Sequence, residues 1–81
     1  MMWELDWGPV AIEDVRRMHW VSAGRLCAAV IDFATTSRGP VHRTNPRDPG
    51  RLELVVPGGI AYLALDFEEG VLRVERMFAR S

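Results

Sequence analysis

The spacing of the apolar residues changes from helical to alternating near the middle of the chain. Before residue 37 they recur every three to four residues, as they do in a helix with one buried face. After residue 50 they alternate with polar residues, which is typical of strands that bury one face in a sheet. Because 81 residues suffice for one domain, we expect residues 1–81 to form a single α+β domain with the helices on one face of the sheet.

The N-terminal part of the chain predicts a strand followed by a helix. Residues 2–7 alternate weakly between apolar and acidic side chains, which indicates the strand. Pro9 suits the first turn of a helix, and we expect this helix to extend to about Trp20. Its apolar face would carry Ala11, Val15 and Met18, and its polar face Glu13, Asp14, Arg16 and Arg17.

A second helix is predicted to follow after only one or two linking residues. Ser22 is the expected N-cap, and residues 35–40 contain the polar, glycine and proline residues that end the helix. So short a link makes the two helices an antiparallel hairpin. The apolar stripe of the second helix consists of Leu26, Ala29, Val30, Phe33 and Ala34.

The C-terminal part predicts one long loop and three strands. Residues 38–50 hold three prolines and two glycines without apolar periodicity, so we expect a loop. Strands are predicted over 51–56, 60–67 and 71–79, with a turn between each pair. The expected fold is therefore β-α-α-β-β-β, a two-layer α+β sandwich with the helical hairpin packed on a mostly antiparallel sheet.

Composition excludes several classes of protein. The net charge of −1, from 10 basic and 11 acidic residues, argues against a strongly basic nucleic-acid coat but allows a local basic patch. No apolar run is long enough for a membrane span, and the N-terminus lacks a secretory signal, so we expect a cytoplasmic protein without a membrane partner. The single cysteine, Cys27, excludes an internal disulfide and is expected to be a small core residue.

No cofactor or metal site is predicted. The two histidines, His19 and His42, fall in a helix and in the loop, and Cys27 has no second cysteine beside it. No glycine-rich phosphate loop lies between a strand and a helix. Asp66, Glu68 and Glu69 are expected to be a solvated turn.

All ten basic residues are arginine, which has two interpretations. One is a compositional bias of the coding sequence, and the other is phosphate recognition, because a guanidinium binds phosphate through two hydrogen bonds. Arginines at loops and strand ends could meet in one concave surface and stabilise the charge that develops when a 2′-hydroxyl attacks a phosphate. The candidate catalytic residues are Arg51, Arg76 and Arg80, and the candidate RNA-binding residues are His42, Arg43 and Arg47.

Arg76 and Arg80 fall on a strand face that otherwise looks apolar. Both share parity with Leu72, Val74 and Phe78, which we assign to the buried face of the last strand. The strand must therefore contain a bulge that turns the arginines outward, or its face must open into a groove near the end.

The chain resembles the RelE/ParE superfamily of bacterial toxins over nearly its full length. The resemblance rests on Leu5-Asp6-Trp7 followed by Gly8-Pro9-Val10-Ala11, on a second helix that ends before Gly39-Pro40, and on a three-stranded meander. The meander starts at Arg51-Leu52-Glu53-Leu54, turns at Gly58-Gly59 and ends in the strand from Leu72 to Arg80.

This resemblance implies a toxin with a cognate antitoxin as its partner. RelE-like members are endoribonucleases that cut mRNA on the ribosome without a metal, and ParE-like members inhibit DNA gyrase. Arg51 and Arg80 match basic positions of the family, but Ala61 and Tyr62 stand where an arginine is common, and Ala79 replaces the basic residue before the closing arginine. The catalytic set is thus incomplete, with Tyr62 or His42 as substitutes for proton transfer. A non-catalytic interaction module of the same fold is the alternative, and so is a gyrase inhibitor.

Overall fold

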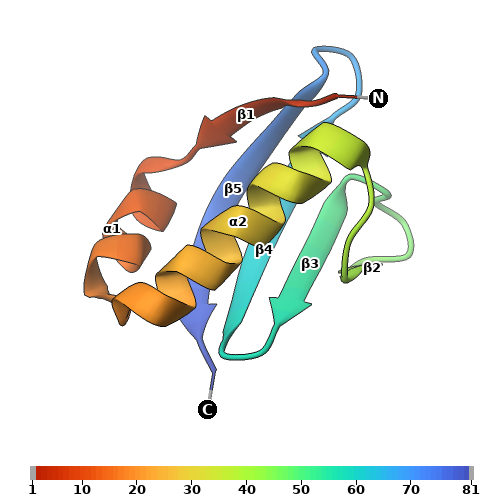
Figure 1. Ribbon diagram of the computed structural model, residues 1–81. Helices are drawn as coiled ribbons and strands as arrows, with labels where there is room; N and C mark the ends of the chain where they lie inside the picture. Colours follow the sequence, from red (N-terminus) through yellow and green to blue (C-terminus); the bar gives the residue numbers. More distant parts are fainter. Residues whose placement is uncertain (1, 81) are drawn as a thin grey trace.

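A computed structural model describes residues 2–80, which form two helices and one sheet (Figure 1). The strands of the described residues lie in the order β1-β5-β4-β3-β2, with β1 parallel to β5 and every other neighbouring pair antiparallel. The expected two-layer α+β fold is confirmed. The elements are β1 (Glu4–Trp7), α1 (Pro9–Arg17), α2 (Trp20–Thr36), β2 (Val41–Arg43), β3 (Arg51–Val56), β4 (Gly59–Asp66) and β5 (Val71–Ala79).

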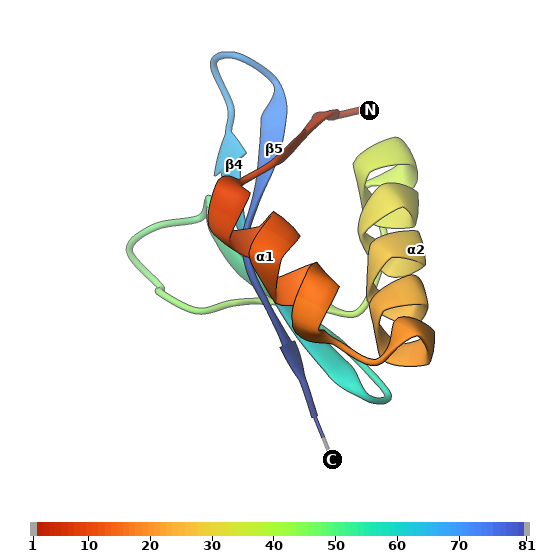
Figure 2. The same ribbon diagram turned by 90° about the vertical axis from the view of Figure 1, so that its left-hand side faces the viewer.

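The two helices occupy different positions relative to the sheet. Helix α2 crosses one face of the sheet and contacts β3, β4, β5 and β1, whereas α1 contacts β5 (Figures 1 and 2). The opposite face of the sheet carries no helix of the described residues, and we call it the open face (Figure 2). Neither helix in residues 2–80 is long and apolar enough to cross a membrane.

The core lies between α2 and the sheet. Leu26 and Val30 of α2 are fully buried, and Phe33 nearly so, because the helical spacing of these residues turns all of them toward the strands. The strands contribute every second residue, as the pleat requires, except between Val74 and Met77 of β5. These buried strand residues are Leu52, Leu54, Ala61, Leu63, Leu72, Val74 and Met77.

The helix boundaries differ from the predicted ones at the link between the helices. Helix α1 ends at Arg17 instead of near Trp20, and α2 begins at Trp20 with His19 as its N-cap. The Nδ1 atom of His19 accepts a hydrogen bond of 3.3 Å from the backbone N–H of Val21. The imidazole of His19 therefore caps the helix, and the prediction of Ser22 as the N-cap is wrong. The link consists of two residues, Met18 and His19, which agrees with the predicted one or two.

The predicted loop at residues 38–50 contains a short strand. Val41–Arg43 forms β2 and pairs with Leu52–Leu54 of β3. Three residues are too few to produce a readable alternation, which is why the sequence did not reveal this strand. The rest of the segment is held by side chain to backbone hydrogen bonds of 3.0 Å, from the N–H of Arg47 to Asn45 and from the N–H of Gly50 to Asp48.

Two glycines give opposite predictions for the same substitution. A Cβ atom added to Gly24 in α2 would meet no atom within 4 Å, whereas one added to Gly59 would lie 2.7 Å from Cγ of Leu26. Gly24→Ala should therefore raise the free energy of unfolding by about 0.5–1 kcal/mol, through lower backbone entropy of the unfolded chain. Gly59→Ala should lower it by about 1–3 kcal/mol through overpacking. Urea unfolding of both variants tests this, and changes of equal sign would contradict the packing described here.

Candidate functional site

The open face presents cross-strand rows of side chains because paired residues of neighbouring strands share a face. Its centre contains charged residues and one tyrosine, and its end toward the β3–β4 turn is apolar. The rows are Arg51, Ala64 and Arg73; His42, Glu53, Tyr62 and Arg76; and Val55, Ile60 and Phe78.

A bulge in β5 decides which residues reach this face. Leu63 pairs with Val74 and Tyr62 pairs with Arg76, so Glu75 is the extra residue. The bulge turns Arg76 to the open face. Of the two predicted alternatives, a bulge in the last strand or a groove near its end, the bulge is therefore present. It also reverses the parity of the residues that follow. Phe78, which was expected in the core, is 40% exposed, and Met77 is buried in its place.

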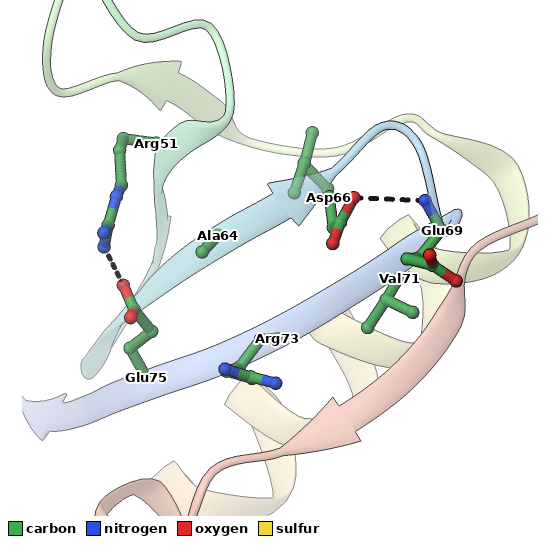
Figure 3. Close-up of a pocket in the computed structure, with 8 residues that line it drawn as sticks. Arg51, Ala64, Asp66, Glu69, Val71, Arg73 and Glu75 are labelled. Carbon is green, nitrogen blue, oxygen red and sulfur yellow. Dashed lines mark hydrogen bonds and ion pairs between the residues drawn. The ribbon is translucent and has the colours of Figure 1, made fainter.

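Arginines of the open face are paired with carboxylates. Arg51 bonds to Glu75 across the sheet (Figure 3). The Nε atom of Arg51 also lies 3.7 Å from Oδ2 of Asp48. The Nε atom of Arg73 donates a hydrogen bond of 2.9 Å to Asp6 on β1. These pairs leave little uncompensated positive charge on this part of the sheet.

A shallow cavity of about 340 Å³ lies over the first row (Figure 3). Two arginines and three carboxylates face it, so the lining has a net negative charge and does not form the predicted cationic hollow. One of the carboxylates, Asp66, accepts hydrogen bonds of 3.1 Å from the backbone N–H groups of Glu68 and Glu69. The cavity is lined by Arg51, Ala64, Leu65, Asp66, Glu69, Val71, Arg73 and Glu75.

A buried carboxylate, Asp14 of α1, joins the helix to β5. Its Oδ2 atom accepts hydrogen bonds of 2.8 Å from Nε of Arg76 and 2.9 Å from the backbone N–H of Met77. Strand β1 ends at Trp7, so no strand of residues 2–80 accepts a hydrogen bond from the Met77 N–H at this edge of β5, and the carboxylate takes that place. The hydrogen bond from Arg76 lowers the pKa of Asp14 and outweighs the opposing effect of burial.

Arg76 is held in position on the open face from two sides. Besides its bonds to Asp14, its guanidinium lies 4.6 Å from the ring centroid of Phe78, a cation–π distance. The ring of Phe78 also meets Tyr62 edge-on at 5.8 Å. The pairing with Asp14 raises the pKa of Arg76, so its charge is fixed.

The structure brings together only part of the predicted site. Arg51, Arg76 and His42 lie in adjacent rows of the open face. Arg80 follows the far end of β5, about 20 Å along the strand from the row of Arg51. Arg43 pairs with Leu52 and so lies toward the helix side of the edge strand, and Arg47 belongs to the connecting loop.

Sequence reasoning placed Asp14 on the polar face of its helix, and this was wrong. Asp14 is buried because it lies three residues after Ala11 and four before Met18, so it falls on the apolar stripe. That spacing was the available signal for a carboxylate that needs a buried partner. Within residues 2–80, no group of three or more His, Cys, Asp or Glu residues is arranged to hold a metal ion.

Comparison with known proteins identifies the fold. The chain is similar to a chain in the crystal structure of the toxin–antitoxin complex RelBE2 from Mycobacterium tuberculosis, with a TM-score of 0.70 and 15% sequence identity. The similarity covers 99% of this chain and 100% of that one. The fold implied by the RelE/ParE resemblance is thereby confirmed. No protein-family model matches the sequence, and no curated protein matches it.

The contact of Asp14 predicts a pH-dependent stability. Because the pKa of Asp14 is lowered in the folded state, its contribution is complete above the unfolded-state pKa of about 4 and is lost as the pH falls through the folded-state pKa. Asp14→Asn should lower the free energy of unfolding at pH 7 by about 1–3 kcal/mol, and this deficit should shrink below about pH 4.

Urea unfolding of both proteins between about pH 7 and pH 3 measures this difference. Glu68→Gln is the control, since Glu68 is exposed and makes no ion pair with a described side chain. A deficit that stays constant with pH, or that Glu68→Gln reproduces, would show that the charge of Asp14 does not contribute.

Proposed function

We propose that this chain is the toxin component of a toxin–antitoxin pair. The observation that carries the proposal is the likeness in fold, along its whole length, to a chain of a toxin–antitoxin complex. The sequence resemblance to RelE/ParE toxins supports the same function from the residues of the first strand, the helical hairpin and the meander.

The partner that we propose is an antitoxin with an acidic, amphipathic segment. Arg43, Arg47 and Arg80 are exposed and make no ion pair with any side chain of residues 2–80. Arg80 lies at the end of β5, Arg47 lies in the loop beside the β2 edge, and Arg43 lies on the helix side of that same edge. An acidic segment that crosses the open face would supply the missing carboxylates and cover the exposed Phe78.

The open face favours a protein target over RNA cleavage. A site that cleaves RNA by charge stabilisation needs positive charge aimed at the phosphate. Here Arg51 is bonded to Glu75, and Arg76 to Asp14, and each carboxylate offsets the charge that a phosphate would meet. We therefore infer that the protein acts by binding, as a gyrase inhibitor of the ParE type would.

Metal-free cleavage of mRNA on the ribosome is the second proposal. It is favoured by Tyr62, which lies next to Arg76 and Phe78 on the open face and could stack on a base or transfer a proton. In this case Arg51 and Arg76, in adjacent rows of the open face, would hold the scissile phosphate. His42, Arg43, Arg47 and the more distant Arg80 would contact the flanking RNA.

Induction of the gene in a bacterial host tests the toxin assignment. We expect growth to stop when the chain is induced alone and to resume when the adjacent gene, which under this proposal encodes an acidic antitoxin, is induced with it. The triple variant Arg43→Glu, Arg47→Glu, Arg80→Glu should lose rescue by the adjacent gene. Arg38→Glu is the control, because Arg38 is an exposed arginine without an ion pair to a described residue. Normal growth under full induction would contradict the proposal.

Two assays on the purified protein separate the mechanisms. Supercoiling of relaxed DNA by gyrase should be inhibited if the target is gyrase, and an unchanged supercoiling rate would reject that target. Translating ribosomes should show new mRNA ends if the protein is a nuclease. In that case Arg51→Ala should lower the cleavage rate at least about tenfold and Arg38→Ala should not, because loss of one charge-stabilising donor costs about 10²–10³-fold. Wild-type protein that cuts no faster than Arg51→Ala would reject the nuclease.

A further inference from the structure

Helix α2 is unusually apolar for a helix that packs against a sheet through only one of its own faces. Only two of its 17 residues are charged, Arg25 and Asp32. Helices at a protein surface normally carry charged or polar residues opposite their buried stripe. The composition of α2 is that of a helix covered on two sides, and the sheet covers only one.

The uncovered side of α2 has a second stripe of apolar and small residues. They are spaced alternately by three and four residues, the spacing of a helix–helix contact. Ile31 is 51% exposed, and Gly24 and Ala28 are exposed as well. We call this stripe the outer seam, and it consists of Val21, Gly24, Ala28, Ile31 and Thr35.

The apolar surface continues beside the outer seam toward α1. A cavity of about 310 Å³ lies there, lined by side chains that are apolar except for Arg16. At the start of α2, Trp20 is 78% exposed. Together these features widen the apolar strip beyond one helix, and contiguous exposed apolar surface of this kind marks an interaction site. The cavity residues are Trp7, Ile12, Val15, Arg16 and Cys27.

The two charged residues of α2 identify the occupant. Arg25 and Asp32 are seven residues apart, so they lie on the same flank of the outer seam at a separation of about 10 Å. Both are exposed, and neither forms an ion pair with a side chain of residues 2–80. If a second copy of this helix lies antiparallel to the first, the positive charge of each copy faces the negative charge of the other.

We propose that α2 docks against α2 of a second copy of this chain in antiparallel orientation. A two-fold axis beside Ala28 places Arg25 of each copy against Asp32 of the other, and the contact closes on itself as an isologous dimer. Gly24 and Ala28 lie near the axis and let the two backbones approach closely, and Ile31 of each copy covers the partner's seam.

The size of the seam defines a weak dimer. Helix α2 is about 25 Å long, and a contact along one such helix buries less than the roughly 800 Å² per partner of a standard stable interface. The chain should therefore exchange between monomer and dimer with a dissociation constant in the micromolar range.

The proposal does not depend on the toxin assignment, because the open face lies on the other side of the sheet (Figure 2).

Charge reversal tests the proposal. Sedimentation equilibrium of the wild-type chain from about 1 μM to about 1 mM should show the average mass rising toward twice that of the monomer. Arg25→Asp alone and Asp32→Arg alone should each weaken the dimer at least tenfold, because each variant opposes like charges. A mixture of the two single variants should dimerise again, since the partners are then complementary, and the double variant should dimerise like the wild type.

Two further variants in the seam, with one control outside it, keep the test independent of folding. Gly24→Gln enters open space in the monomer, so the fold should persist by circular dichroism while the dimer weakens. Val10→Glu is the control for Ile31→Glu, because Val10 is 50% exposed on α1 and lies outside the seam. Only Ile31→Glu should lower the average mass toward that of the monomer.

A chain that stays monomeric up to 1 mM, or single variants whose mixture stays monomeric, would overturn the proposal. A monomeric chain whose seam variants lose antitoxin binding would assign the seam to the antitoxin instead.

Discussion

The carboxylate of Asp14 is the contact on which the arrangement of this small domain depends. Strand β1 covers only the first half of β5, and the second half would leave an unpaired edge. Asp14 supplies an acceptor to the Met77 N–H from a helix 63 residues earlier in the chain. A buried charge is tolerated there because Arg76 is bonded to the same oxygen atom. One side chain thus attaches α1 to the sheet edge and holds Arg76 on the open face.

The bulge at Glu75 and the Asp14 contact act on neighbouring residues of β5. The bulge turns Arg76 outward and Met77 inward, and Asp14 then receives a hydrogen bond from each of them. Glu75, the extra residue, is left to pair with Arg51. The same local irregularity therefore creates the charge balance of the open face. This balance is the physical reason for favouring a protein target over a phosphate.

The sequence predicted the elements well and the site less well. The bounds of β5 were predicted correctly, and the parity of Arg76 indicated either a bulge or an open groove, because nine residues give a clear alternation. Strand β2 was missed because three residues give none, and the N-cap role of His19 was missed because a nearby serine is the usual choice. The pairing of Arg51 with Glu75 was not predictable, since it joins residues on strands that are not neighbours in the sheet. Periodicity reports which face a residue occupies and says little about its partner across the sheet.

The two surfaces described here lie on opposite sides of the molecule. Helix α2 separates the outer seam from the sheet, and the sheet separates α2 from the open face (Figure 2). A dimer formed through the outer seam would leave both open faces exposed and pointing away from each other. Such a dimer would present two copies of the open face to a partner. If that partner is itself dimeric and the spacing of its two sites matches that of the two open faces, the second contact becomes intramolecular. A weak contact between the two outer seams is then sufficient to strengthen the whole assembly. Pairing of α2 with a second copy would therefore add to binding at the open face without competing with it.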